Sequence, residues 1–172
     1  MTTGLIPRTL PWAKKVLNRL RVVDAPPRPI LMLDTIPTHG NRAWRGYAGS
    51  YAGDFFDVAR PVFRYADVDV RPDEHHEFVT LPEGETVQLK RRPDAEMAAL
   101  QALAAAGFEK IPSHTLDTFG RPPEGVFGLA GEDAWSIFMR DGRDALRAAG
   151  WQVEYPDDFR HHLLEVDGED VR

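Results

Sequence analysis

Two pairs of adjacent histidines are the residues of this 172-residue chain whose type and spacing come nearest to a metal site. They are His75–His76 and His161–His162. Adjacent residues of a strand point to opposite faces, so one pair cannot supply two ligands to one ion. If the two strands met, one histidine of each pair could bind a metal together with Glu74 or Glu77. Exposed or hydrogen-bonded histidines are the simpler explanation, so we expect no metal and no cofactor.

Basic side chains gather in three places along the chain, where they could contact phosphate groups or a protein partner. Residues 1–24 hold five basic side chains against one acid, whereas residues 151–172 hold seven acids against two arginines. The net charge of -6 argues against the whole chain being a basic nucleic-acid binder. The candidate contacts, for which ordinary solvated surface is the alternative, are Lys14, Lys15, Arg19, Arg21, Lys90, Arg91, Arg92, Arg140, Arg143 and Arg147.

Motifs of well-known catalytic sites are missing from the sequence. There is no Gly-rich phosphate loop ending in Lys and Ser/Thr, no GxGxxG turn and no GxSxG nucleophile turn. The lack of cysteine excludes disulfides, thiolate zinc sites and cysteine nucleophiles. No apolar run approaches the ~20 residues that span a bilayer, and no secretory signal is recognisable. We therefore expect a cytoplasmic chain that is not itself an enzyme and has no membrane partner.

The elements that would position these residues begin with a short amphipathic helix over residues 10–22. Its apolar residues Trp12, Val16, Leu17 and Leu20 recur at helical spacing, which is typical of a stripe that packs on a core. The Pro-rich stretch that follows, residues 25–29, predicts a stiff connector, because proline fixes φ and disfavours helix in the residue before it.

The middle of the chain predicts a small antiparallel sheet. Strands are expected over residues 30–33, 62–70, 75–81 and 85–92, the last two joined as a hairpin. The aromatic- and glycine-rich stretch 47–56 predicts a strand with bulges or a hairpin. A helix follows, with Asp94 as its cap and Gly107 as its stop. Its residues Met97, Leu100 and Leu103 are expected to face inward.

A second helix is expected between residue 131 and Gly150, with Gly142 marking a break or a close contact. Strands are expected over 126–129, 151–155 and 160–166, and Leu146, Trp151 and Val153 would fix the helix against the sheet. The predicted fold class is α+β, with a small, mostly antiparallel sheet, two principal helices packed on it and the short N-terminal amphipathic helix. The expected regions are 1–25 (basic helix and linker), 26–166 (interaction domain) and 167–172 (acidic tail).

Four segments follow one another in an order that resembles a known family. They are PPRPILML, the aromatic- and glycine-rich stretch YAGSYAGDFF, VQLKRRPDAEMAALQALAAAGF and EDAWSIFMRDGRDALRAAGWQVEYPDDFRHHL. Over about residues 26–165 the chain resembles the region upstream of the ATPase motor in bacterial SWI/SNF-type helicases. The positions that carry the resemblance in the last segment are Glu132, Ala134, Trp135, Phe138, Leu146, Arg147, Gly150, Trp151, Val153, Glu154, Asp158 and Phe159.

The chain departs from that family in one respect, because the two RecA-like motor domains are missing from it. No catalytic residue can therefore be carried over. The resemblance implies a non-catalytic accessory module for DNA processing that acts with a helicase-type motor in cis or in trans, and with DNA indirectly. A stand-alone protein-binding adaptor and a small His-dependent metal enzyme are the alternatives. The sequence leaves the oligomeric state open.

Overall fold

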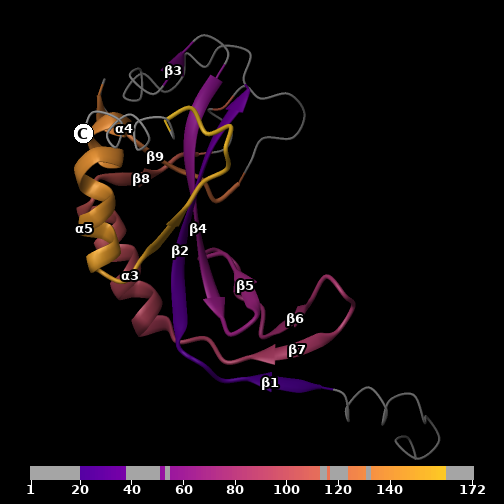
Figure 1. Ribbon diagram of the computed structural model, residues 1–172. Helices are drawn as coiled ribbons and strands as arrows, with labels where there is room; N and C mark the ends of the chain where they lie inside the picture. The colour runs from indigo at the N-terminus through magenta and orange to yellow at the C-terminus, as the bar shows by residue number, and fades with distance from the viewer. Residues whose placement is uncertain are drawn as a thin grey trace, which may run out of the picture.

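Two eleven-residue strands form the centre of the molecule (Figure 1). The computed structural model describes residues 20–37, 51–52, 55–112, 116, 124–130 and 133–161. Strand β2 (Pro27–Pro37) pairs antiparallel with β4 (Phe55–Tyr65) along their whole length. The sheet order is β10-β2-β4-β9-β8, with β10 (Gln152–Glu154) parallel to β2. The remaining strands are β9 (Phe127–Leu129), β8 (Phe108–Lys110), and β3 (Tyr51–Ala52) and β5 (Val68–Val70), which also pair with β4.

A second, three-stranded sheet lies at one end of the long strands. Its order is β1-β7-β6, formed by Arg21–Val23, Thr86–Leu89 and Phe78–Thr80 respectively. Strand β1 is parallel to β7, and β6 is antiparallel to it. This small sheet buries Val23, Val87 and Leu89 against Phe63 and Tyr65 at the end of β4, so the two sheets share a core.

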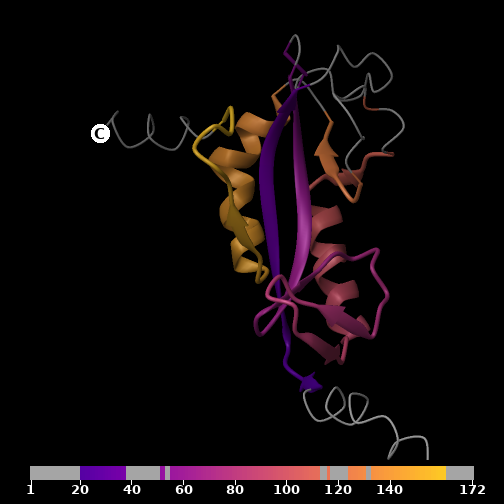
Figure 2. The ribbon, with the colours of Figure 1, turned by 90° about the vertical axis from the view of Figure 1, so that its right-hand side faces the viewer.

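The helices cover one face of the main sheet, behind β2 and β4 in Figure 2. They are α3 (Pro93–Ala105), α4 (Ala134–Ile137), the π-helical segment η3 (Phe138–Gly142) and α5 (Arg143–Ala148). The core between helices and sheet contains Leu31, Leu33, Leu103, Phe108, Trp135, Phe138, Met139, Leu146, Trp151, Val153 and Phe159. Gly107 and Gly150 end α3 and α5 with φ of +99° and +105°, as predicted from the sequence.

The π-helical segment explains the glycine that interrupts the second helical pattern. A Cβ atom at Gly142 would lie 2.9 Å from the Phe138 ring, which is too close for any other residue without a shift. The expectation of a break or a close contact at this position is confirmed. In a π-helical segment each backbone hydrogen bond spans five residues instead of four, as from the Arg143 N–H to the Phe138 carbonyl.

The α+β class is confirmed, but the sheet was predicted too simply. There are two sheets rather than one small one, and each contains a parallel pair of strands. The prediction of one continuous strand over 62–70 is wrong. Strand β4 ends at Tyr65, Ala66 turns the chain with φ of +56°, and β5 pairs back onto β4. None of the helices in the described part of the chain is long and apolar enough to cross a membrane.

Several predicted boundaries also differ from the structure. Residues 21–22, expected in the N-terminal helix, belong to β1, while 10–19 and the tail 167–172 lie outside the described residues. Residues 75–77 are a loop, and 160–161 are a turn rather than part of a strand. Helix α3 begins at Pro93 with Arg92 as its N-cap residue, so Asp94 is not the cap. Met97 does not face inward, since it is 58% exposed.

Candidate functional site

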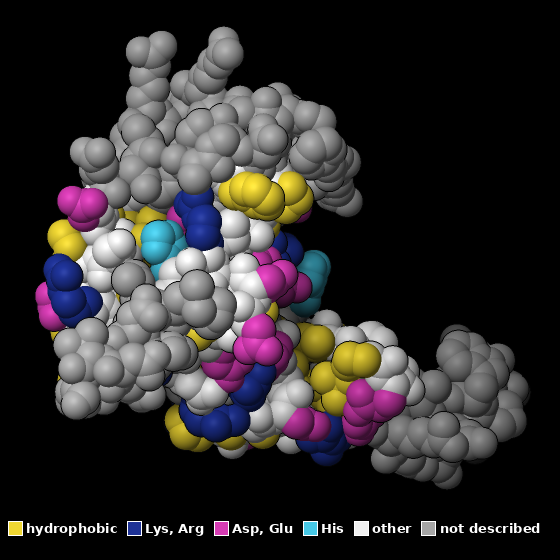
Figure 3. Space-filling view, turned by 45° about the horizontal axis from the view of Figure 1, so that its top comes forward, with side chains coloured by type: hydrophobic (Ala, Val, Ile, Leu, Met, Phe, Trp, Pro, Cys, Tyr) yellow, Lys and Arg dark blue, Asp and Glu magenta, His cyan; other side chains and the backbone are white. Residues whose placement is uncertain are grey.

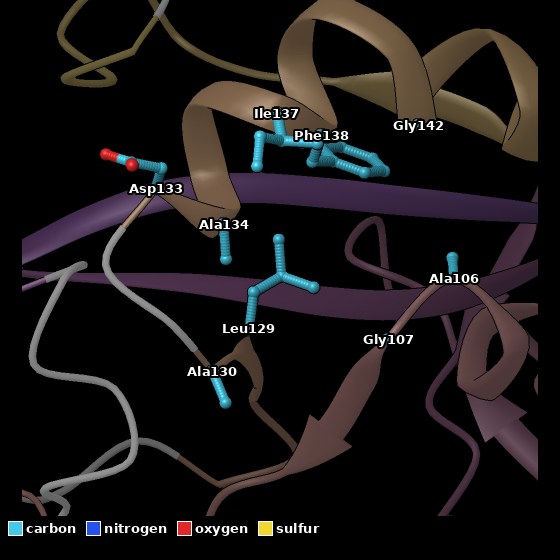
Figure 4. A pocket seen from close by; sticks show the side chains of 9 residues that line it. All are labelled: Ala106, Gly107, Leu129, Ala130, Asp133, Ala134, Ile137, Phe138 and Gly142. Carbon is cyan, nitrogen blue, oxygen red and sulfur yellow. The ribbon is translucent and has the colours of Figure 1, made fainter.

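Helix α3 is flanked by two shallow apolar pockets, one near each end. The first, here called the Leu129 pocket, has a volume of about 490 Å³ and lies between the end of α3, β9 and the α4–η3 segment. Figure 4 shows Leu129, Ala134, Ile137 and Phe138 facing this space, with Asp133 at its edge. The remaining lining residues are Ala106, Gly107, Ala130 and Gly142.

The second pocket, here called the Phe63 pocket, has a volume of about 440 Å³. It is lined by the start of β2, the first half of α3 and the end of α5, and its residues are Pro27, Arg28, Pro29, Phe63, Ala95, Ala98, Ala99, Ala149 and Gly150. Phe63 is fully buried. The Trp151 ring lies 6.2 Å from it, centroid to centroid, and its indole N–H donates to the Ala99 carbonyl at 3.0 Å. Trp151 therefore holds α3 at the wall of this pocket.

The chemistry of the two pockets is that of a docking surface for apolar side chains. Alanine, glycine and proline line most of both, so the backbone of a partner can approach closely. Each pocket has one charged residue, Asp133 in the first and Arg28 in the second. Met97 and Ile137, which are 58% and 49% exposed, add apolar surface on the same helices. Concave apolar surfaces with few polar groups are typical of binding sites. In protein interfaces, the side chains that contribute most to affinity are often buried in such pockets.

A buried polar cluster around Asp57 was missed by the sequence analysis. The Asp57 side chain is completely buried on β4, on the face that the helices cover. Its carboxylate accepts a hydrogen bond from Thr35 Oγ1 at 2.8 Å and one from the Arg160 guanidinium. His161 Nε2 lies 2.9 Å from Asp57 Oδ2. The only signal in the sequence was an acid within the apolar run FFDVARPVF.

This cluster fastens the end of the described chain to the central strands. The Arg160 backbone N–H donates to Thr35 Oγ1 at 3.1 Å, so the residue contacts both β2 and β4. The His161 ring stacks on Trp135, with centroids 6.2 Å apart and planes 13° apart. Because Asp57 is on β4 and its partners lie on β2 and in the segment after β10, the carboxylate acts as a structural tie.

A second buried carboxylate, Glu96, ties α3 to the small sheet and to β4. Arg91 donates to both its oxygens, at 2.7 and 2.8 Å, and the Tyr65 hydroxyl donates to Oε2. The same hydroxyl accepts the Arg92 backbone N–H at 3.0 Å. Burial alone would raise the pKa of Glu96, but the hydrogen bonds from Arg91 and Tyr65 outweigh it and lower the pKa below its usual value. Burial, with a further contribution from Glu96, raises the pKa of Tyr65.

We expect Glu96→Gln to reduce the free energy of unfolding at neutral pH by about 1.5–3 kcal/mol, because a charged hydrogen-bond network loses its charge. A lowered carboxylate pKa stabilises the fold above its unfolded value of about 4.3, and this contribution is lost as the pH falls through the folded value. The difference between wild type and variant should therefore shrink in acid. Urea denaturation between pH 7 and pH 3 measures it. Glu83→Gln, in the exposed turn before β7, is the control and should change stability by less than about 0.5 kcal/mol.

The predicted basic contacts of the first half of the chain lie around the small sheet. Arg21 is exposed and bridges Asp67 and Glu85 with N–O distances of 3.1 Å. Lys90 is exposed at the end of β7, and Arg92 is exposed beside Asp24 at 3.3 Å. Arg91 also reaches the carbonyls of Arg71 and Glu74, so its guanidinium is used inside the molecule. Lys14, Lys15 and Arg19 lie outside the described residues.

The three arginines of the second helical segment do not share one solvated face. Arg140 and Arg147 are exposed, near Asp141 at 3.5 Å and Asp144 at 3.8 Å. Arg143 is 9% exposed and donates to the Tyr155 hydroxyl at 3.1 Å. In a regular α-helix positions 140, 143 and 147 would lie on one face, but the π-helical segment before Arg143 changes the helical register.

The described histidines of the two pairs lie in separate places. His75 and His76 are exposed in the loop before β6, whereas His161 lies in the Asp57 cluster, and His162 is outside the described residues. In the part of the chain that the structure describes, no group of three or more His, Asp or Glu side chains could hold a metal ion. Comparison with models of known protein families, with curated proteins and with solved structures gave no match.

Proposed function

We propose that this chain is a non-catalytic, cytoplasmic accessory module that acts with a helicase-type, DNA-dependent ATPase motor. The motor is carried by the same polypeptide or by a separate one. The observation that carries the proposal is the pair of apolar pockets near the two ends of α3, which are lined mainly by small residues. A partner helix or loop can bury apolar side chains there.

The ordered sequence resemblance supports the choice of partner. Several positions that carry it are core residues, among them Trp135, Phe138, Leu146, Trp151 and Phe159. Residues of this kind preserve a scaffold, so they account for a resemblance between accessory regions without any shared catalytic group. In this proposal the buried contacts of Asp57 and Glu96 keep the helices that line the two pockets rigid. A rigid surface helps binding, because it loses less conformational entropy on association.

The test is the effect of the purified chain on the ATPase motor domain of a bacterial SWI/SNF-type helicase. The wild-type chain should bind the motor and change its DNA-stimulated rate of ATP hydrolysis. Ala98→Arg places a long charged side chain in the Phe63 pocket and should weaken binding at least ~10-fold, a loss of about 1.4 kcal/mol.

Ala104→Arg is the matched control, because it makes the same change at an exposed alanine of α3 that lines neither pocket. Its affinity for the motor should equal that of the wild type. Equal weakening by both variants would place the contact elsewhere on the chain. The proposal fails if the wild-type chain neither binds the motor nor alters its rate, or if the chain alone hydrolyses ATP.

A further inference from the structure

Both apolar pockets lie between the same two helical segments. The Phe63 pocket contains Ala98 of α3 and Ala149 at the end of α5. The Leu129 pocket contains Ala106 at the end of α3 and Ala134 at the start of α4. Helix α3 therefore runs antiparallel to the segment α4–η3–α5, and both pockets belong to the space between them, here called the helical seam.

The spacing of the two pockets fits one helix of a partner. Along α3, Ala98 and Ala106 are separated by a rise of about 12 Å, and along the other segment Ile137 and Ala149 are separated by about 18 Å. On a helix, side chains ~11 residues apart project from nearly the same face, because they are about three turns and 16.5 Å apart. One helix can therefore place an apolar side chain in each pocket.

A helix is also the conformation that satisfies the backbone of a bound segment. The backbone groups along α3 and α5 are hydrogen-bonded within these helices, so an extended segment in the seam would find no backbone partners there. Ala102 and Ala145 lie one helical turn from the pocket residues Ala98 and Ala149. Their small side chains let a third helix approach closely between the pockets.

Two aspartates of the seam have no ion-pair partner among the described residues. Asp133 lines the Leu129 pocket, and Asp94 lies one helical turn before Ala98 of the Phe63 pocket. Both are exposed, and no basic side chain of the described chain pairs with either. Because they lie at opposite ends of the seam, they favour basic side chains at both ends of the bound helix.

The exposed arginines of the same helices are already paired. The guanidinium groups of Arg140 and Arg147 lie 3.5 and 3.8 Å from aspartates of their own segment. Figure 3 shows the same pattern on the face in view, where basic side chains lie beside acidic ones. Arg28, which also lines the Phe63 pocket, alternates with Pro29 along β2, so its side chain points to the opposite face of the sheet. The charge left for a partner is therefore negative.

We propose that the partner binds the helical seam with a single basic amphipathic helix. This helix places one apolar side chain in each pocket and basic side chains beside Asp94 and Asp133. The two pockets then act as one site, and a change in either weakens the same contact. The inference rests on the proposed function only for the source of the helix, which is the motor.

A synthetic helix tests the seam without the motor. The probe is a fluorescein-labelled peptide of about 20 residues, built from alanine and lysine, with two leucines ~11 residues apart and lysines near both ends. Fluorescence anisotropy with the full chain should show saturable binding. A peptide of the same composition with its leucines ~9 residues apart, on opposite faces of the helix, should bind at least ~10-fold more weakly. It is the control for unspecific attraction to an acidic chain.

Substitutions at exposed positions identify the contacts. Ala98→Arg in one pocket and Ile137→Arg in the other should each weaken peptide binding about 10-fold, which corresponds to about 1.4 kcal/mol. Ala104→Arg, outside both pockets, should leave the affinity unchanged. Asp94→Asn and Asp133→Asn should each weaken binding only about 3-fold, because exposed ion pairs contribute little.

The outcomes separate this inference from the proposed function. If the motor binds but the peptide does not, or if both peptides bind equally, the single-helix inference is overturned and the proposed function stands. Sensitivity to only one of Ala98→Arg and Ile137→Arg would also overturn it, because the pockets would then act separately. A dimer of the chain that Ile137→Arg dissociates would place a second copy in the seam, with the same consequence. Peptide binding by a chain that does not bind the motor would support the helix site and overturn only the choice of partner.

Discussion

Replacing Asp57 by asparagine should lower the free energy of unfolding by about 3 kcal/mol, the lower end of the cost of removing one partner from a buried ion pair. The carboxylate is fully buried and serves three partners, Thr35, Arg160 and His161. Asparagine keeps the shape but removes the negative charge that the buried Asp57 carboxylate presents to the partly buried Arg160 guanidinium. Chemical denaturation at neutral pH gives the value directly.

Asp34→Asn is the matched control for this prediction. Asp34 is on β2, opposite Val58 rather than Asp57, and its carboxylate lies 4.0 Å from Arg60 with 34% of the side chain exposed. Exposed ion pairs contribute ~0–1 kcal/mol, so this variant should cost less than that. A loss below about 1 kcal/mol in Asp57→Asn would mean that the cluster is an incidental contact and does not fasten the chain end.

The contacts of the Asp57 cluster could not be predicted from the sequence. Asp57 and Arg160 are 103 residues apart, and no local pattern reports a contact over such a separation. An acid in an apolar strand was visible, but its partners depend on tertiary structure. By contrast, Gly107 and Gly150 act through their own backbone conformation, so the ends of both helices could be predicted from single residues.

The prolines of the central strands were misread for a physical reason that the structure supplies. Pro27 and Pro29 looked like a connector, because proline has no N–H to donate in a sheet. Both lie in the part of β2 that, among the described strands, pairs with β4 alone, since β10 pairs with Ile30–Met32. Pro61 lies similarly in β4 between the pairings with β9 at Ala59 and with β5 from Phe63. Proline is tolerated at such edge positions.

The candidate site was harder to predict than the fold. The pockets are lined mainly by alanine, glycine and proline, and no pattern of residue types marks a surface made by the absence of large side chains. The basic side chains that the sequence marked and the structure describes lie around the small sheet and along η3 and α5 instead. Trp151 connects the predicted scaffold with the candidate site, because it was predicted as a core residue and it contacts Phe63 and Ala99, which line the Phe63 pocket.

We expect Trp151→Ala to lower the free energy of unfolding by about 3–5 kcal/mol, since it leaves a large cavity in the core. The side chain is 2% exposed, contacts Phe63 and donates its indole N–H to the Ala99 carbonyl. Trp151→Phe keeps most of the ring but loses the donor, so it should cost less and report the hydrogen bond, at about 1–3 kcal/mol. Urea denaturation of the two variants separates the free-energy cost of the cavity from that of the lost hydrogen bond.

Gln152→Ala provides the control, because the neighbouring residue of β10 is exposed and should change stability by less than about 0.5 kcal/mol. Trp151 also fixes the distance between α3 and β10, so Trp151→Phe should deform the Phe63 pocket while the protein stays folded. Motor binding by this variant should therefore weaken in the same direction as binding by Ala98→Arg. A folded Trp151→Phe variant with unchanged motor affinity would show that the pocket does not form the contact, whatever its effect on stability.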